Sequence, residues 1–430
     1  MENFLSTKEI TLLRRLGKQV SEIAQDPKWK EKEKLWKKKN TLHKTRPLIL
    51  CTIAEAGWDE MIPPSNLEIQ DPFFRYYERY LKKQIYRSMN LRDDEIIDNK
   101  IYVPYILHRK DWIEGRIRPY DARPDHSAKF TPCILETNDL KKLQFPDFEY
   151  DEAETRRQFE YVQEVFGDSM EVVLGEPFYA STESEILGWG HSLIDLWCEL
   201  RGLGTVFYDL YDEPEFTKEA MAFLQEGTLR YLRQYEKTGL LKLNNNGFIK
   251  LTNTPLGSNA LGCTDELPSK EFDGTNVTFR DLWGYSMAQE FTLISPDMLE
   301  EFVLKFQAPI ADMFGLNAYG CCENNDAKWD VIQKYIPRIR EMSVPFASSL
   351  ETAADKLGDR FVLCWKPNVV DLIGHDDTVR LRTQMRKEME TAKKCHLVYA
   401  LRDAQTLLGD IKRAAVWTEM AMEMAREYGE

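Results

Sequence analysis

The sequence predicts an α/β fold of the (β/α)8 TIM-barrel type with an N-terminal helical extension. From residue 46 onward, short β-branched and aromatic runs alternate with segments of helical pattern. Such runs, mostly free of charge, are typical of parallel strands that are buried on both faces. No glycine-rich nucleotide loop follows the first run. The pattern therefore favours a barrel over a doubly wound sheet.

Composition narrows the class of protein. The chain has 430 residues, 43% of them hydrophobic, and a formal net charge of −14. That sign excludes a nucleic-acid binder that works through general phosphate attraction. The sequence shows no secretory signal and no apolar stretch of about 20 residues. The eight cysteines form no spaced framework, so we expect reduced thiols in a cytoplasmic protein that binds neither membrane nor nucleic acid.

Residues 1–45 are predicted to form a helical arm. Apolar residues recur at helical spacing between Ile10 and Ile23, and a dense lysine run with two tryptophans follows at 28–44. This run is either a helix that docks a partner or a solvated helix packed over the barrel or a dimer neighbour. Charge runs usually coat exposed helices, which favours the second alternative.

The barrel is predicted over 46–430, with a helical insertion at about 55–100. In the insertion, a helix is expected from Asp71 to Met89. Further helices are expected from Ser295 to Gly315, from Ser349 to Gly358 and from about Asp403, on capping and periodicity signals. The runs expected to be strands are 47–54, 101–107, 171–179, 205–210, 248–254, 316–322, 360–365 and 396–401.

Cysteines at two predicted strand ends are the sharpest chemical pattern. Active-site residues of such barrels follow the C-terminal ends of the strands. Cys321 and Cys322 end one run, and Cys364 lies at the end of the next. These thiolates, with a carboxylate or an imidazole, could hold a catalytic zinc ion with an open position. The alternative is that they are buried free cysteines, which are among the most buried residues. The candidates for the further ligand are Glu323, Glu176 and His375.

Carboxylates form a second set of candidates. A pair of carboxylates across a barrel mouth suits glycoside hydrolysis, but a chain with 71 acidic residues carries many by chance. Motifs of serine hydrolases, phosphate-loop proteins and HExxH metalloproteases are absent. The candidate catalytic residues are Glu176, Asn253 and Glu323, and the wider carboxylate set adds Glu136, Asp265, Glu266 and Glu290.

The second half of the chain resembles the uroporphyrinogen decarboxylase superfamily, and more closely its decarboxylase-like bacterial branch. The resemblance is carried by three segments and by the helix predicted between the first two. The segments are DLWGYSMAQE from Asp281, YGCCE from Tyr319 and FVLCWKPN from Phe361. The resemblance runs from about Arg46 to the C-terminus and implies a (β/α)8 barrel, with a homodimer as the expected assembly.

The resemblance implies one of two activities. True decarboxylases carry PxWxMRQAGR at the first strand, where this chain has RPLILCTIAEAGW from Arg46. The substrate-binding arginines are missing, so porphyrinogen decarboxylation is not expected. The other activity is zinc-dependent methyl transfer between a small substrate and a corrinoid protein. Its thiol-methylating members bind zinc through a His-x-Cys pair and a later cysteine, near which Cys321, Cys322 and Cys364 fall here.

Two departures qualify that implication. The histidine of the pair is absent, so Glu323 or another carboxylate would have to replace it. The chain also lacks an Asp-x-His-x-x-Gly cobalamin signature, so a corrinoid would come on a separate protein at the barrel mouth, where the lysine-rich arm could contribute. The sequence and this resemblance together predict a zinc-dependent methyltransferase that acts on a small molecule. The alternatives are a decarboxylase or lyase acting on a small carboxylated substrate, and a non-catalytic ligand-binding barrel.

Overall fold

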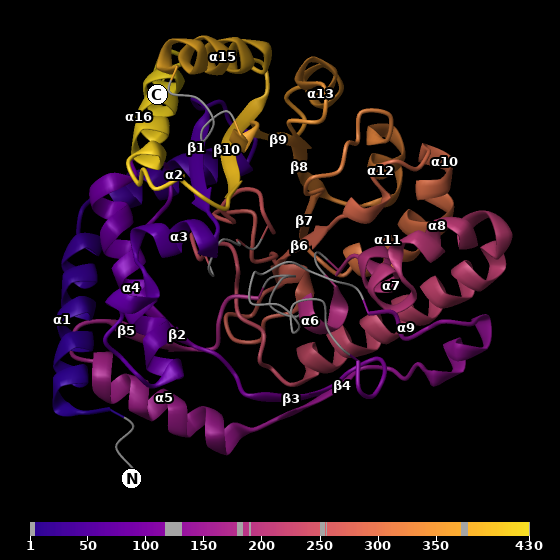
Figure 1. Ribbon diagram of the computed structural model, residues 1–430, viewed down its shortest axis with the longest axis horizontal. Coiled ribbons are helices and arrows are strands. Elements are labelled where there is room, and N and C mark those ends of the chain that lie inside the picture. The colour runs from indigo at the N-terminus through magenta and orange to yellow at the C-terminus, as the bar shows by residue number, and fades with distance from the viewer. Residues whose placement is uncertain are drawn as a thin grey trace.

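A curled parallel sheet dominates the computed structural model, which describes residues 5–116, 131–178, 184–188, 191–249, 254, 256–370 and 377–429. Six strands pair in the order β1-β10-β9-β8-β7-β6 (Figure 1). The predicted α/β barrel class is confirmed, although hydrogen bonds between the described strands do not close the barrel. The strands are β1 (Leu48–Ile53), β6 (Trp283–Ser286), β7 (Leu316–Tyr319), β8 (Ile339–Pro345), β9 (Val362–Lys366) and β10 (His396–Ala404).

Two smaller sheets and many helices surround this sheet. Strands β2 (Lys100–Val103) and β5 (Glu171–Leu174) form a parallel pair, and β3 (Leu107–Lys110) and β4 (Asp147–Tyr150) form an antiparallel one. The principal helices are α1 (Thr7–Ala24), α2 (Lys28–Asn40), α3 (Glu55–Met61), α4 (Pro72–Asn90), α5 (Glu152–Phe166), α6 (Ser184–Leu187), α7 (Leu193–Arg201), α8 (Leu203–Asp212), α9 (Pro214–Lys237), α10 (Pro296–Leu299), α11 (Lys305–Ala311), α12 (Trp329–Tyr335), α13 (Leu350–Leu357), α15 (Thr378–Thr391) and α16 (Arg413–Arg426).

Alternation along the strands separates two hydrophobic layers. In β9, Val362 and Cys364 face the concave side, whereas Leu363 and Trp365 join the layer beneath the outer helices. Successive side chains of a strand point to opposite faces, so a parallel strand between two layers is apolar throughout. This explains why the short unbroken runs were recognisable in the sequence.

Side chains, rather than further strands, pair with the two edges of the sheet. At the β1 edge, Asp94 accepts the N–H of Ile49 at 2.8 Å and Asp93 accepts that of Cys51 at 2.9 Å. At the β6 edge, Asn244 accepts the N–H of Trp283 at 2.9 Å and donates to its carbonyl at 3.0 Å. An unpaired strand edge is a template for aggregation, and these polar groups block it.

The concave face is covered by the chain itself. Leu256, Leu261 and Cys263, from the segment before β6, pack against inward apolar side chains from five of the six strands, all but β8. Trp36 of α2 joins them, fully buried, with its indole N–H donated to the carbonyl of Asp94 at 2.8 Å. Arg340, at the start of β8, donates to the carbonyl of Asn40 at the end of α2. Helix α2 therefore contacts the N-terminal end of the sheet.

The arm is packed onto the rest of the chain. Helix α1 contacts α4 and α5, as Figure 1 shows on the side of the molecule that carries the N-terminus. Of the two alternatives for the arm, a helix packed over the rest of the chain therefore matches the structure. The domain boundary at residue 45 stays a prediction. The helix predicted from Asp71 is α4, which Asp71 caps by accepting the N–H of Phe74. None of the described helices is long and apolar enough to cross a membrane.

Several predicted elements need correction. The prediction of a strand at 205–210 is wrong, because these residues lie in α8. A short apolar run does not distinguish a strand from a buried helix. Phe248 and Ile249 are not in a strand, and 250–253 lie outside the described residues. The helix predicted from Asp403 begins at Arg413, because β10 continues to Ala404. Strands β6 and β8 were missed, the second because Arg340 and Glu341 interrupt its apolar pattern.

Replacement of Trp36 tests whether the arm belongs to the core. Trp36→Ala removes a fully buried side chain, and we expect a loss of about 3–5 kcal/mol of unfolding free energy. Urea unfolding measures it. Lys38→Ala, at an exposed position of the same helix, should stay within about 0.5 kcal/mol of the wild type. Equal effects of the two substitutions would show that α2 is not part of the cooperative fold.

Candidate functional site

The cysteine pair follows the C-terminal end of β7 directly. The strand ends at Tyr319, three residues before the predicted limit, and Gly320 turns the chain with a φ of +93°. That backbone conformation favours glycine. Because the strand has ended, the alternation rule does not force Cys321 and Cys322 to opposite faces. Cys321 is half-buried and Cys322 is exposed.

The two thiols lie within contact of each other and of a hydroxyl group. The sulfur atoms of Cys321 and Cys322 are 3.6 Å apart. The hydroxyl of Ser258 lies 3.2 Å from the Cys321 sulfur. Ser258 comes from the segment that covers the concave face, so the site joins this segment to the end of β7.

A buried ammonium group lies beside the pair. Lys366, the last residue of β9, is 3% exposed and donates to the Ser258 hydroxyl at 2.6 Å and to the Cys321 carbonyl at 2.8 Å. Ser343 of β8 donates to the same carbonyl at 2.7 Å. The side chain of Ser258 therefore lies between the Lys366 ammonium and the Cys321 sulfur, and three neighbouring segments fix the position of Cys321.

This surrounding favours the thiolate form of Cys321. The hydrogen bond from Cys322, the charge of Lys366 and the Ser258 hydroxyl lower the pKa of Cys321 to about 6, against the opposing effects of burial and Glu323. Thiolates, not thiols, are the nucleophiles and metal ligands. At neutral pH, Cys321 is thus prepared for either role.

Glu323 holds the loop after β7 to the loop after β6. Its carboxylate is 1% exposed and accepts the N–H of Cys321 at 2.7 Å and the N–H of Ala288 at 3.1 Å. Each oxygen atom thus already has a backbone partner. The predicted site residue Glu323 is next to the thiol pair, and the geometry gives it a positioning task.

Deeper in the concave layer lie Cys364 and Glu341. Cys364 is fully buried among apolar side chains, and burial raises the pKa of its thiol strongly, with a smaller contribution from Glu341. Burial likewise raises the pKa of Glu341 to about 8, opposed by the charge of Lys366. The Ala260 backbone and the Asn259 side chain also lie near this carboxyl and lower its pKa to a lesser extent. Cys364 and Glu341 therefore carry their protons at neutral pH.

Of the other candidates, Glu290 follows β6 in the loop that Glu323 holds. Burial and, to a lesser extent, both of these residues raise the pKa of Asp195. The next candidates lie elsewhere. Glu176 follows β5 and lies near Tyr76 and Tyr102, whose pKa values it helps to raise. Asp265 pairs with Lys37 and Glu266 with Arg340, both at the N-terminal end of the sheet. Asn253 and His375 lie outside the described residues.

A complete metal centre does not emerge from the described part of the chain. In it, no group of three or more His, Cys, Asp or Glu side chains is placed to hold a metal ion. That Cys321, Cys322 and Cys364 bind a metal ion stays a prediction; of the three, only Cys321 and Cys322 have their sulfur atoms in contact. Sequence reasoning missed Ser258 and Glu341. Neither carries a motif. Ser258 reaches the site through the path of the chain across the concave face, whereas Glu341 lies on β8, a strand that the sequence pattern did not reveal.

Comparison with known proteins gives one structural likeness to report. No protein-family model matches the chain, and no curated protein does. Among solved structures, the chain is similar to a methyltransferase from Methanosarcina mazei, with a TM-score of 0.45, 9% identity, and coverage of 91% of this chain and 98% of that chain. Likeness at this level does not identify a substrate or cofactor, because one fold serves many functions.

The pH dependence of alkylation tests the state of Cys321. In chelator-treated protein, we expect the peptide with the thiol pair to react with iodoacetamide with a midpoint near pH 6, read by mass spectrometry. Lys366→Met removes a positive charge and should move the midpoint upward. Cys395, whose pKa burial raises to about 11, is the internal control. A wild-type midpoint at the ordinary thiol value would contradict the assignment.

Glu341 should make stability depend on pH. The unfolded chain releases this proton near pH 4.5, whereas the folded chain holds it up to about pH 8. This residue therefore lowers the unfolding free energy progressively as pH rises between those values. Glu341→Gln should gain stability over the wild type at pH 8 and little at pH 4.5, measured by thermal unfolding. Glu219→Gln, at an exposed position of α9, should show no such trend, and an equal trend would refute the interpretation.

Proposed function

We propose that this chain is a zinc-dependent methyltransferase of the uroporphyrinogen-decarboxylase-like class. A methyl group would pass between a small substrate and a separate corrinoid protein, with Cys321 and Cys322 as zinc ligands. One observation carries the proposal: two sulfur atoms lie 3.6 Å apart just beyond the C-terminal end of a parallel strand, and one has a pKa near 6. Barrel enzymes place their active sites at this end.

The spacing of the pair suits a shared metal ion. With zinc–sulfur bonds of about 2.3 Å in tetrahedral geometry, two thiolates lie about 3.8 Å apart. The observed separation of 3.6 Å requires little movement. A catalytic zinc site usually has a third protein ligand, for which we retain Cys364. Cys321 lies near enough to Cys364 to contribute to its raised pKa.

The residues around the pair have defined tasks in this proposal. When bound, zinc would act as a Lewis acid that activates a substrate thiol or the oxygen atom that carries the methyl group. Lys366 offsets the negative charge of the thiolates, and Ser258 hydrogen-bonds to Cys321. Glu323 fixes the backbone of Cys321 through its N–H group. These contacts hold the ligand pair in one orientation before substrate arrives.

The arrangement favours methyl transfer over the lyase alternative. A lyase of a small carboxylated substrate would have its carboxylates clustered at the mouth and no thiol directed to it. Here a thiol pair follows β7, while Asp265 and Glu266 lie at the opposite end of the sheet. Lys37 and Asn40, near the end of α2, contact that same opposite end of the sheet. We therefore propose that a corrinoid protein docks at the mouth without the arm.

Metal content tests the proposal. Protein purified without chelator should contain about one zinc ion per chain, measured by inductively coupled plasma mass spectrometry. Cys321→Ser should lose the metal, because it removes the thiol whose pKa is lowered. Cys364→Ser should weaken retention if it is the third ligand.

Cys395→Ser is the matched control, because Cys395 lies away from the pair and hydrogen-bonds to the carbonyl of Ala354. It should retain the wild-type metal content. Metal-free wild-type protein, or full zinc in Cys321→Ser, would contradict the proposal.

A further inference from the structure

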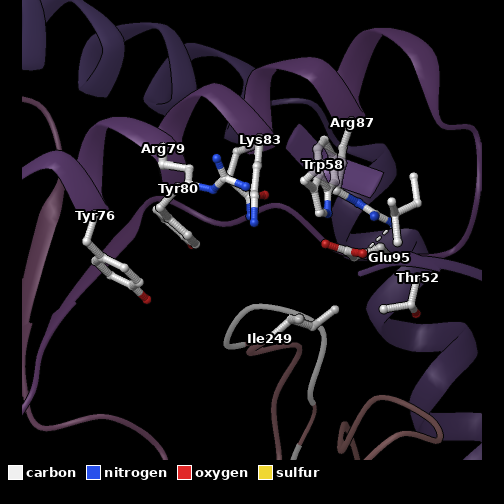
Figure 2. A pocket seen from close by; sticks show the side chains of 11 residues that line it. Thr52, Trp58, Tyr76, Arg79, Tyr80, Lys83, Arg87, Glu95 and Ile249 are labelled. Carbon is white, nitrogen blue, oxygen red and sulfur yellow. Dashed lines mark ion pairs between the residues drawn. The ribbon is translucent and has the colours of Figure 1, made fainter. Parts of the chain in front are cut away.

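A small cavity lies between helix α4 and the end of β1, apart from the thiol pair. Figure 2 shows it with the side chains of Arg79, Lys83 and Arg87 above it and Ile249 below. These three cations are spaced by four residues, so they lie on one face of α4. The volume of the cavity is about 40 Å³, and a single water molecule requires roughly 10–15 Å³. The space suits a ligand of a few heavy atoms.

Two of the three cations already have full ion-pair partners. Arg79 pairs with Glu55 at 3.0 Å and with Asp59 at 2.6 Å. Arg87 pairs with Asp93 at 2.6 Å and also with Glu95. Both guanidinium groups therefore help to build the wall of the cavity.

The third cation, Lys83, is only partly engaged. It donates to Glu55 at 2.5 Å, and its ammonium lies 5.3 Å from the ring centre of Trp58. Its side chain is 9% exposed. An ammonium group has three protons to donate, and Glu55 accepts one and is shared with Arg79. Figure 2 shows the Lys83 nitrogen directed into the cavity.

The carboxylate of Glu95 faces Lys83 from the other side of the cavity. The Glu95 side chain is 9% exposed and lines the cavity. In Figure 2 its carboxylate lies between Arg87 and the open space, across from Lys83. Burial raises the pKa of Glu95 to about 7, opposed by the charge of Arg87. A cationic group placed beside Glu95 would favour its ionised form. A cation and an acidic group therefore face the cavity from two sides.

Neutral hydrogen-bonding groups complete the lining. Among the described residues, none hydrogen-bonds to the hydroxyl groups of Tyr76 and Tyr80, to the indole N–H of Trp58 or to the amide of Gln84. Polar groups in such an enclosure usually have partners. The lining thus offers several donors near Lys83, together with aromatic surface.

The charge balance limits the class of ligand. The charged residues of the lining are Arg79, Lys83, Arg87 and Glu95. Glu55, Asp59 and Asp93 lie outside the lining and pair with these cations, so the charges around the cavity nearly cancel. A ligand with a large net charge would leave an unpaired charge in a confined space, which is unfavourable. A molecule with one charge of each sign would not.

We propose that this cavity binds a small zwitterion of amino-acid size, with its carboxylate toward Lys83 and Trp58 and its cationic nitrogen toward Glu95. The aromatic ring of Tyr80, which lines the cavity together with Glu95, would accept a methylated as well as a primary ammonium group. The proposal does not depend on zinc or on methyl transfer, because no residue of the thiol pair contributes to the cavity.

Isothermal titration calorimetry of the full chain tests the proposal. The probes are glycine, β-alanine and glycine betaine, with acetate and methylammonium as the two halves of the charge pattern. At least one zwitterion should give saturable binding, and both half molecules should bind at least about tenfold more weakly, a difference of about 1.4 kcal/mol. Lack of saturable binding by all three zwitterions, or equal affinity for acetate, would overturn the proposal.

Two variants locate the binding site. Lys83→Met leaves Glu55 paired with Arg79, and Glu95→Gln keeps an oxygen atom for Arg87, so both should fold, as circular dichroism will check. Each should weaken zwitterion binding at least about tenfold. Lys34→Met on the surface of α2 is the matched control and should bind as the wild type does. Unchanged affinity in Lys83→Met would place the ligand elsewhere and refute the assignment.

Discussion

The arrangement of the loops at the C-terminal end of the sheet depends on the hydrogen bonds of one buried ammonium group, that of Lys366. A charge taken out of water is costly unless it is paired and hydrogen-bonded. Lys366 meets this need through the Ser258 hydroxyl and the Cys321 carbonyl, and through the thiolate that its own charge stabilises. The segment over the concave face, the end of β7 and the end of β9 must therefore meet at one point.

The edges of the sheet explain why the remainder of the barrel is irregular. Asp93 and Asp94 pair with β1, and Asn244 pairs with β6, where a regular barrel would have neighbouring strands. Asp93 also forms an ion pair with Arg87, which lines the α4 cavity. The side chain that protects the edge of β1 therefore also holds a residue of the cavity wall in place. The link continues to the thiol site: Thr52 of β1 lines the cavity and accepts from Arg402, whose charge acts on Lys366.

Sequence reasoning was strongest where one local signal determines one element. Apolar runs such as 47–54 and 360–365 are buried on both faces in parallel strands, so their pattern survives in the fold. It failed for 205–210, where an apolar run belongs to α8, and for β8, where Arg340 and Glu341 hide the strand. The pair of Cys321 and Cys322 could be located from the end of β7, whereas Cys364 lies inside β9 and not at its end. Ser258 could not be located, because its position depends on how the chain between β5 and β6 crosses the concave face. Glu341 was missed together with β8. The α4 cavity was missed because it depends on how α4 packs against the end of β1.

The proposed zinc site at the end of β7 requires that Cys321 and Cys322 together bind the metal ion. X-ray absorption at the zinc edge of the protein as purified tests it most directly, because the method reports the type and distance of the ligands. The account predicts at least two sulfur ligands at about 2.3 Å, and fewer in Cys322→Ser. A zinc ion bound only by nitrogen and oxygen atoms would contradict it.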